Sequence, residues 1–143
     1  MLCLLGDIKR DGSFYVRAWE ESDKKCARAM RSLGRMRFYE NKFEEAIECF
    51  NKAFEINRLY PSEWFTCGCA HMRLEQFEKA VFFFGNVISI DETQTDAWAN
   101  IANCYAVQDK FTEALACTEQ ALKQKRSDWR IWHNCIKFNI ACG

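Results

Sequence analysis

Large apolar residues and small residues recur along this chain at one fixed interval, the distance that separates Trp64 from Trp98. Five sets of positions follow the interval: Trp64, Trp98 and Trp132; Phe43, Phe77 and Phe111; Ala46, Ala80 and Ala114; Ala53, Val87 and Ala121; and Gly34, Gly68 and Ala102. A repeat of about 34 residues indicates an array of supersecondary units that bury their apolar faces against one another. The sequence therefore predicts a repeat protein.

Each unit combines two segments with helical periodicity. In the first unit, Met30, Leu33 and Gly34 follow the spacing i, i+3, i+4, and Phe43 and Ala46 start a second such pattern. This spacing places the residues on one face of a helix. The small residues let two helices approach closely, and the aromatic residues supply most of the buried area. We predict helices over residues 27–40, 43–57, 62–74, 77–90, 95–108, 111–124 and 129–141.

Local signals mark the ends of these helices. Polar pairs at 41–42, 75–76 and 109–110 separate the two helices of each unit. Pro61 suits the first turn of a helix, where its missing N–H costs nothing. Thr95 and Asp128 are predicted N-caps, because a side-chain oxygen can accept a hydrogen bond from the free N–H groups at a helix start.

Composition narrows the fold and the function. One proline and six glycines in 143 residues argue against a turn-rich β-sandwich or barrel. The 20 basic and 20 acidic residues leave no net charge, which argues against charge-driven binding to nucleic acid or to an anionic membrane. No apolar run approaches the roughly 20 residues of a membrane span.

The cysteines indicate a reducing environment. Their number is nine, which is odd, and most of them lie at apolar helical positions, where a free thiol behaves as a small hydrophobic side chain. Asp7, Lys9 and Arg10 interrupt the apolar start of the chain, so no secretory signal is predicted. We therefore expect the protein in the cytoplasm or the nucleus.

The period and two segments resemble the tetratricopeptide repeat (TPR) family. Trp64-Phe-Thr-Cys-Gly-Cys-Ala and Trp98-Ala-Asn-Ile-Ala-Asn-Cys-Tyr are similar to the opening of a TPR unit. The resemblance implies an all-α fold, a right-handed α-solenoid of antiparallel helix pairs. It implies repeats at 27–60, 61–94 and 95–128, the first helix of a further repeat at 129–143, and an irregular partial repeat at 1–26 that Leu5-Gly6 opens. The proline common near the end of a unit is replaced by Arg58, Glu92 and Arg126.

A narrower resemblance spans nearly the whole chain. Residues 3–11, Ala18-Trp-Glu, Ala27-Arg-Ala and residues 128–134 look like the eukaryotic tetratricopeptide repeat protein 27 family. That resemblance implies a non-enzymatic, intracellular role in protein assembly or scaffolding, and a repeat region of a longer protein. We expect the last helix to expose apolar surface unless further repeats, or self-association, cover it.

The TPR resemblance also implies a concave groove lined by the first helix of each unit. We predict that these positions bind a segment of a partner protein: Arg28, Arg31, Arg35, Phe38, Phe65, Cys69, Met72, Arg73, Asn103, Arg130 and His133. Three of them, Arg28, Arg31 and Arg35, form one helical stripe, and guanidinium groups bind carboxylates in a bidentate manner. The stripe indicates either a site for an acidic peptide segment or a solvated face with salt bridges to the next repeat.

Some TPR proteins hold the acidic C-terminus of Hsp70 or Hsp90 in a carboxylate clamp of Lys, Asn, Asn, Lys and Arg. The resemblance places those positions at Arg31, Arg35, Thr66, Asp96 and Asn100. Only the charge of Arg31 is retained, and Asp96 would repel a carboxylate. We expect no clamp in this segment.

Candidate chemistry is sparse. Cys67, Cys69 and His71 suggest a metal site, but on a helix Cys69 points away from the other two, and zinc requires four ligands in a tetrahedron. The chain has no glycine-rich phosphate loop and no nucleophile or metalloprotease motif. We therefore predict no metal, no cofactor and no enzymatic activity.

Two functional interpretations stay open. The first is a protein-interaction scaffold whose groove holds a partner segment, and the second is a structural segment of a longer solenoid whose groove is filled by its own chain. RNA binding by helical repeats ranks below both, because the chain is neutral and the groove positions of the second and third units are mostly apolar or acidic.

Overall fold

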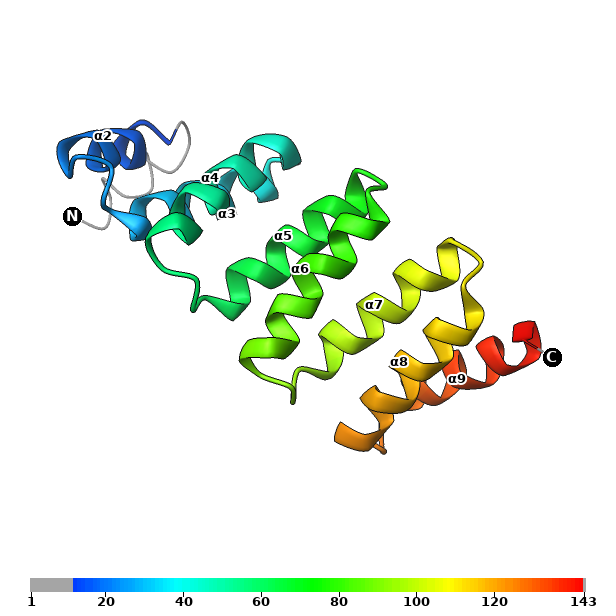
Figure 1. Cartoon of the computed structure of the whole chain (residues 1–143). Helices are drawn as coiled ribbons and strands as arrows, with labels where there is room; N and C mark the ends of the chain where they lie inside the picture. Colours follow the sequence, from blue (N-terminus) through cyan, green and yellow to red (C-terminus); the bar gives the residue numbers. More distant parts are fainter. Residues whose placement is uncertain (1–11, 143) are drawn as a thin grey trace. The chain divides into compact units, whose positions relative to one another are not determined.

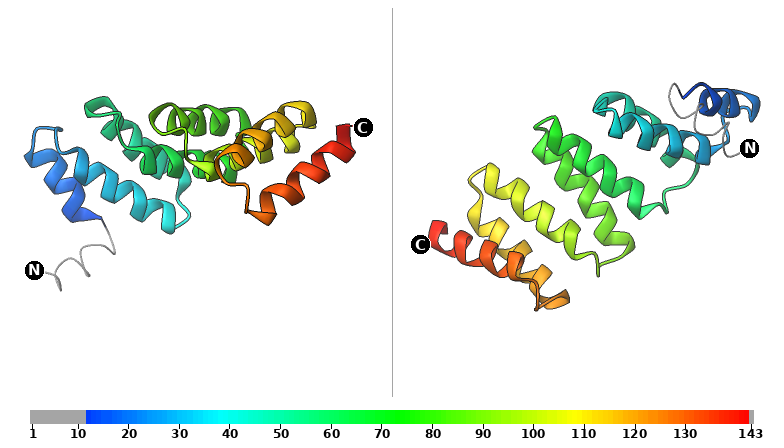
Figure 2. Two further views of the ribbon diagram at one scale, coloured as in Figure 1. Left: turned by 90° about the horizontal axis from the view of Figure 1, so that it is seen from below. Right: turned by 180° about the vertical axis from the view of Figure 1, so that it is seen from behind.

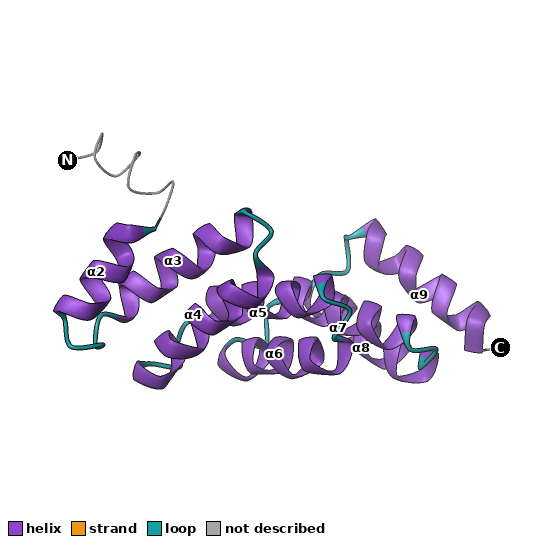
Figure 3. Ribbon diagram, turned by 90° about the horizontal axis from the view of Figure 1, so that it is seen from above, coloured by secondary structure: helices purple, strands orange, loops and turns teal. Residues whose placement is uncertain are grey.

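The computed structural model describes residues 12–142, and within that range the chain forms helices and no strand (Figures 1 and 3). The helices are α2 (Ser13–Glu21), α3 (Ala27–Tyr39), α4 (Phe43–Ile56), α5 (Pro61–Arg73), α6 (Phe77–Ile90), α7 (Thr95–Val107), α8 (Phe111–Gln124) and α9 (Trp129–Cys142). The predicted all-α class and the helices from 27 onwards are confirmed, with every boundary within one residue. The predicted opening of the partial repeat at Leu5-Gly6 lies outside the described residues.

The chain divides into two compact units, residues 1–70 and 71–143, and each is described by itself. In the first unit α3 and α4 pack side by side as an antiparallel pair, and α2 packs on α3 (Figure 2). Trp19, Met30 and Leu33 form the core of this unit with smaller residues of α3 and α4. Gly34 is required by this packing, since a Cβ there would lie 2.8 Å from the ring of Phe50.

The second unit repeats this arrangement with α7 and α8, and α9 packs on α8. Phe84 and Val87 of α6 are buried, as are Ile101 of α7 and Leu122 of α8. On α9 the buried residues are Ile131, Cys135 and Phe138, and they contact the α7–α8 pair through residues such as Ala102, Ala114 and Ala121. The small and apolar columns of the sequence therefore form the core in both units.

The turn within each repeat uses a left-handed residue at a fixed place. Asn41, Glu75 and Asp109 have φ angles of 62°, 59° and 59°, and they recur at the repeat period. The residue after each donates its backbone N–H to a carbonyl five positions earlier, at 2.8–2.9 Å, which closes the end of the first helix. The predicted breaks at 41–42, 75–76 and 109–110 are confirmed.

A repeated indole hydrogen bond fixes the turn between repeats. The Nε1–H groups of Trp64, Trp98 and Trp132 donate to the carbonyl oxygens of Arg58, Glu92 and Arg126 at 2.7, 3.3 and 2.6 Å. These carbonyls belong to the positions where other TPR units commonly carry proline. The tryptophan column therefore stabilises the turn, and Trp64 and Trp98 also pack against core residues.

The two predicted N-caps have different outcomes. Asp128 precedes α9, and its Oδ1 accepts the backbone N–H of Arg130 at 3.0 Å, which confirms the cap. The prediction for Thr95 is wrong, because Thr95 is already the first residue of α7 and Gln94 occupies the cap position without a side-chain hydrogen bond. Pro61 is the first residue of α5, as predicted.

Candidate functional site

A groove of about 1080 Å³ lies on the first unit, between α2 and the exposed side of α3. Its lining combines aromatic, apolar and charged side chains: Phe14, Tyr15, Ala18, Cys26, Arg28, Ala29, Ser32, Arg35, Met36, Tyr39 and Glu40. Arg28 and Arg35 were predicted as binding positions, and the structure places both on its wall. The helical spacing of α3 presents them on one side of the helix.

Aromatic side chains provide the apolar part of this groove. Tyr39 is 81% exposed, and Phe14 is 43% exposed with its ring packed edge-on against Tyr15, the ring centroids 5.6 Å apart. Phe14 and Tyr15 were not predicted as binding residues, because α2 does not belong to a regular repeat unit. Two neighbouring aromatic residues shortly before the first regular repeat were the available signal.

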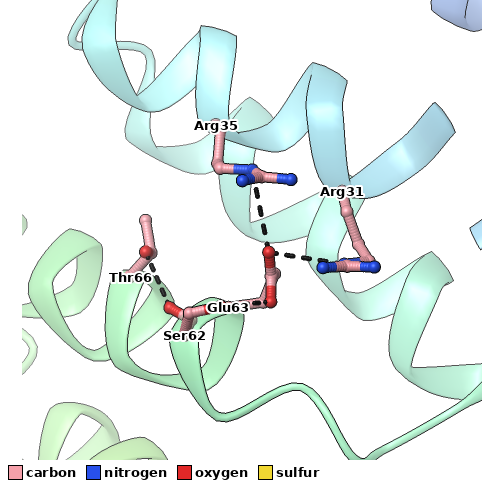
Figure 4. A network of polar contacts seen from close by, with 5 residues as sticks. All are labelled: Arg31, Arg35, Ser62, Glu63 and Thr66. Carbon is pink, nitrogen blue, oxygen red and sulfur yellow. Dashed lines mark hydrogen bonds and ion pairs between the residues drawn. The ribbon is translucent and has the colours of Figure 1, made fainter. Parts of the chain in front are cut away.

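Arg31 and Arg35 both point toward a buried carboxylate on α5 (Figure 4). Oε1 of Glu63 lies 3.3 Å from Nε of Arg31 and 3.7 Å from Nε of Arg35. Ser62 donates its hydroxyl to the other carboxylate oxygen at 2.7 Å, and the guanidinium of Arg31 lies 3.8 Å above the ring of Tyr60. The contacts to the arginines are ion pairs, because neither Arg31 Nε nor Glu63 Oε1 makes a hydrogen bond.

The exposure of these side chains shows which charges are buried in the packing and which are accessible to a partner. Glu63 is 1% exposed, and Arg31 is largely covered, so both belong to the packing between the first two repeats. About half of the Arg35 side chain is accessible, and Arg28 is exposed on the groove wall. The salt-bridge interpretation of the stripe therefore describes Arg31 well, while Arg28 and the outer part of Arg35 present positive charge to the groove.

Glu63 was not predicted from the sequence, although a signal was present. It occupies the same repeat column as Ala29, Ala97 and Ile131, and all three of those are buried. A carboxylate in a column of buried apolar residues must find positive partners, because an unpaired buried charge is costly. The arginines one repeat earlier are those partners.

The other predicted binding positions are distributed over both units. Phe38 packs edge-on against Tyr39 and Phe43, with ring centroids 5.9 and 5.5 Å apart. Phe65 and Cys69 are half-buried on α5. In the second unit the positions are Met72, Arg73, Asn103, Arg130 and His133. Their role in binding a partner stays a prediction.

Arg130 is engaged locally. Its Nε and Nη2 lie 3.3 and 3.2 Å from the two carboxylate oxygens of Asp128, and this hydrogen bonding holds the pKa of Asp128 below its ordinary value. The same hydrogen bonding raises the pKa of Arg130, and the charge of Asp96 on α7 adds a smaller contribution in that direction. Arg130 is exposed at the start of α9, so its charge remains near solvent.

In the segment with Cys67, Cys69 and His71, the side chains of Cys67 and His71 are buried and packed. Cys67 is fully buried and burial raises the pKa of its thiol, and burial likewise raises the pKa of Cys117 to about 11. His71 stacks on Phe83 with ring centroids 4.7 Å apart, and its Nδ1 lies 2.8 Å from Oε1 of Gln76. Within residues 12–142, no three His, Cys, Asp or Glu side chains gather as a metal site would require.

Acidification is expected to destabilise the protein through His71. Burial lowers the pKa of His71 below its ordinary value of 6.5; the Gln76 contact raises the pKa and the charge of Lys79 lowers it. As pH falls below about 6.5, the unfolded chain binds a proton that the folded chain does not, so the free energy of unfolding decreases until pH passes below the folded pKa. Urea denaturation at about pH 7.5 and about pH 5.5 measures this change.

The matched controls are His71→Phe, which keeps an aromatic ring against Phe83, and His133→Gln on the exposed surface of α9. We expect the decrease to become smaller in His71→Phe and to stay in His133→Gln. An equal decrease in wild type and His71→Phe would assign the effect to other groups.

Comparison with known proteins places this arrangement in one family. Models of the tetratricopeptide repeat match residues 27–60, 64–94 and 95–128. The chain belongs to the tetratricopeptide repeat family. None of the helices described here is long and apolar enough to cross a bilayer.

Within that family the chain is similar to two much longer proteins. It is 38% identical over 141 residues to the tetratricopeptide repeat protein 27 homolog of Dictyostelium discoideum, covering 99% of this chain and 16% of that protein. It is 34% identical over 139 residues to the TPR repeat-containing protein C19B12.01 of Schizosaccharomyces pombe, covering 96% of this chain and 17% of that protein. The chain therefore spans about one sixth of the length of these relatives.

Solved structures share the fold at low sequence identity. YrrB, a TPR protein with an unusual peptide-binding site, is similar with a TM-score of 0.81 and 22% identity, over 96% of this chain and 70% of that chain. The first TPR domain of Spaghetti (RPAP3), bound to the HSP90 peptide SRMEEVD, has a TM-score of 0.73 and 21% identity, over 81% of this chain and 92% of that chain. These similarities show the TPR fold.

Proposed function

We propose that this chain is a non-enzymatic protein-interaction scaffold, and that its α2–α3 groove holds a segment of a partner protein during complex assembly. The observation that carries the proposal is the groove itself, which is open, lined by aromatic side chains and bordered by Arg28 and Arg35. Peptide binding by YrrB and by the RPAP3 domain supports it, because the same fold holds peptides in those proteins. We place this function in the cytoplasm or the nucleus, in line with the many free thiols.

The charges around the groove favour an acidic partner segment. Arg31 and Arg35 share one buried carboxylate, Glu63, and Arg28 is exposed on the groove wall, so the three arginines keep an excess of positive charge. Glu40, which also lines the groove, already pairs with Arg37 at 2.9 Å and Lys42 at 3.6 Å. A segment that carries Asp or Glu beside an aromatic or aliphatic side chain complements this surface.

The Hsp70/Hsp90 carboxylate clamp is not part of this proposal. Arg31, which occupies the first clamp position, already contacts the carboxylate of Glu63, and Asp96 occupies a position where the clamp needs a positive charge. The peptide bound to the RPAP3 domain therefore supports only peptide binding by this fold, and no contact of that peptide is transferred to this chain.

Peptide selection tests the proposed groove. A displayed library of random peptides would be selected on the wild-type chain, and affinities of the enriched peptides measured by fluorescence anisotropy. We expect enrichment of Asp and Glu next to apolar residues, and an affinity about tenfold lower for the Arg28→Glu variant, because it reverses a charge on the groove wall. Affinity should also decrease with added salt, which screens exposed charges.

Arg17→Glu is the matched control, because Arg17 is exposed on α2 of the same unit and does not line the groove. Equal losses for Arg28→Glu and Arg17→Glu would show a general charge effect and contradict a specific groove. A selection that enriches no acidic peptide would contradict the proposed partner chemistry. If no peptide is enriched at all, the groove is a structural surface of a longer solenoid.

A further inference from the structure

The turn between α8 and α9 presents the hydroxyl of Ser127 to solvent. In the described part of the chain, three serine or threonine residues lie outside the helices: Ser22, Thr93 and Ser127. The Ser22 hydroxyl donates to the backbone oxygen of Trp19 at 2.8 Å. The Thr93 hydroxyl donates to Oδ1 of Asp91 at 2.6 Å. Neither the hydroxyl nor the backbone N–H of Ser127 has a hydrogen-bond partner among the described residues, so an enzyme reaches this oxygen without breaking a contact.

The sequence around Ser127 is basic. Four basic side chains lie within four residues of it, and all are exposed: Lys123, Lys125, Arg126 and Arg130. Asp128 is the single acidic residue between positions 123 and 130, and it pairs with Arg130 at 3.2 Å. The other three basic residues form no ion pair within the part of the chain that the structure describes. Protein kinases select substrates by such charge patterns, and a basic segment suits an acidic substrate cleft.

The equivalent turn of the preceding repeat lacks both properties. Thr93 lies one repeat before Ser127, in the turn between α6 and α7. Residues 91–96 contain three acidic residues and no Lys or Arg. Asp91 occupies the position equivalent to Lys125, and its carboxylate accepts the hydrogen bond from the Thr93 hydroxyl. The same fold therefore presents one bonded hydroxyl in acidic surroundings and one free hydroxyl in basic surroundings.

Position 125 also leaves a hydrogen-bond donor of the turn unused. In the first two repeats a side-chain oxygen accepts the backbone N–H of the residue two positions later: Asn57 that of Leu59 at 2.9 Å, and Asp91 that of Thr93 at 3.0 Å. Lys125 occupies this column in the third repeat and has no acceptor atom on its side chain. A phosphate on Ser127 brings acceptor oxygens beside this N–H and beside the basic side chains of Lys125 and Arg126.

We propose that Ser127 is phosphorylated by a protein kinase that selects basic segments. In this reaction Oγ of Ser127 attacks the γ-phosphorus of ATP, the Oγ–P bond forms, and the bond from the γ-phosphorus to the β,γ-bridging oxygen breaks. ADP leaves, and the hydroxyl proton passes to the catalytic carboxylate of the kinase. The phosphate adds a charge of about −1.5 to −2, which offsets most of the positive charge of Lys123, Lys125 and Arg126. This site is separate from the α2–α3 groove and independent of the function proposed for that groove.

Phosphorylation of the folded chain tests the proposal. The whole chain would be incubated with ATP, Mg²⁺ and the catalytic domain of protein kinase C, which phosphorylates basic segments, and the modified residues identified by peptide mass spectrometry. We expect phosphate on Ser127, and a rate for Thr93 that is lower by at least about tenfold. The Ser127→Ala variant should lose this modification.

An exchange of charge between the two turns provides the matched control. Two double variants carry it out: Lys125→Asp with Arg126→Glu, and Asp91→Lys with Glu92→Arg. Circular dichroism establishes that both are folded. The first variant keeps the Ser127 hydroxyl and should slow its phosphorylation by about tenfold or more. The second should make Thr93 a substrate, because it supplies basic neighbours and removes the carboxylate that binds the Thr93 hydroxyl.

Three outcomes would overturn the proposal. The first is a wild-type chain that stays unmodified at Ser127. The second is phosphate on a synthetic peptide of residues 120–134 but not on the folded chain, which would show that the turn is closed to a kinase. The third is an equal rate at Ser127 in wild type and in the variant with Lys125→Asp and Arg126→Glu, which would show that the basic residues do not select this serine.

Discussion

We expect the Glu63→Ala variant to lose about 2–3 kcal/mol of unfolding free energy. The substitution removes a buried carboxylate and leaves Arg31, which is largely covered and lies over Tyr60, without its counter-charge. Removing one partner of a fully buried ion pair costs about 3–5 kcal/mol, and the effect here is smaller because Arg35 is half-exposed and stays hydrated. Urea denaturation followed by far-UV circular dichroism measures the loss.

Two comparisons isolate the ion-pair contribution. Glu55→Ala removes an exposed glutamate of the same unit and is expected to change stability by no more than about 0.5 kcal/mol. Combining Glu63→Ala with Arg31→Met removes both charges, so the double variant should recover part of the loss. If Glu63→Ala and Glu55→Ala were equally stable, the buried pair would contribute nothing to folding.

The helices could be predicted almost to the residue because three independent signals coincide. The repeat period identifies the columns, the spacing within each unit identifies the helical faces, and the polar pairs at 41–42, 75–76 and 109–110 place the turns. The column of Ala46, Ala80 and Ala114 must be buried, so it fixes which side of each helix faces the core. Periodic apolar positions report on packing directly, and packing determines this fold.

The candidate site was less accessible from the sequence. Positions on a groove wall were assigned by counting along the repeat, which ignores what the neighbouring repeat places beside them. Counting therefore missed the contact between Arg31 and Glu63 of the next repeat, which stabilises the packing between the two repeats. Phe14 and Tyr15 were not counted because they precede the first regular repeat. The bonds from Trp64 and its equivalents to backbone carbonyls were also out of reach, since no side chain at positions 58, 92 or 126 takes part.

The helical register itself can be tested at Ala80, where we expect the largest loss of stability. Ala80 is fully buried in α6, as its equivalents Ala46 and Ala114 are in α4 and α8. A glutamate at this position would place an unpaired charge in close-packed apolar surroundings, and the chain can avoid that cost only by displacing a helix. We expect Ala80→Glu to lose at least about 4 kcal/mol, which is enough to unfold the second unit at room temperature.

Lys79→Glu provides the matched control, because Lys79 is the adjacent residue and is exposed. It introduces the same side chain one position away, so its expected effect is within about 0.5 kcal/mol. Circular dichroism and thermal denaturation of the two variants side by side measure the difference. Wild-type helicity and melting temperature in Ala80→Glu would mean that residue 80 faces solvent. Every column that shares its repeat period would then have to be reassigned.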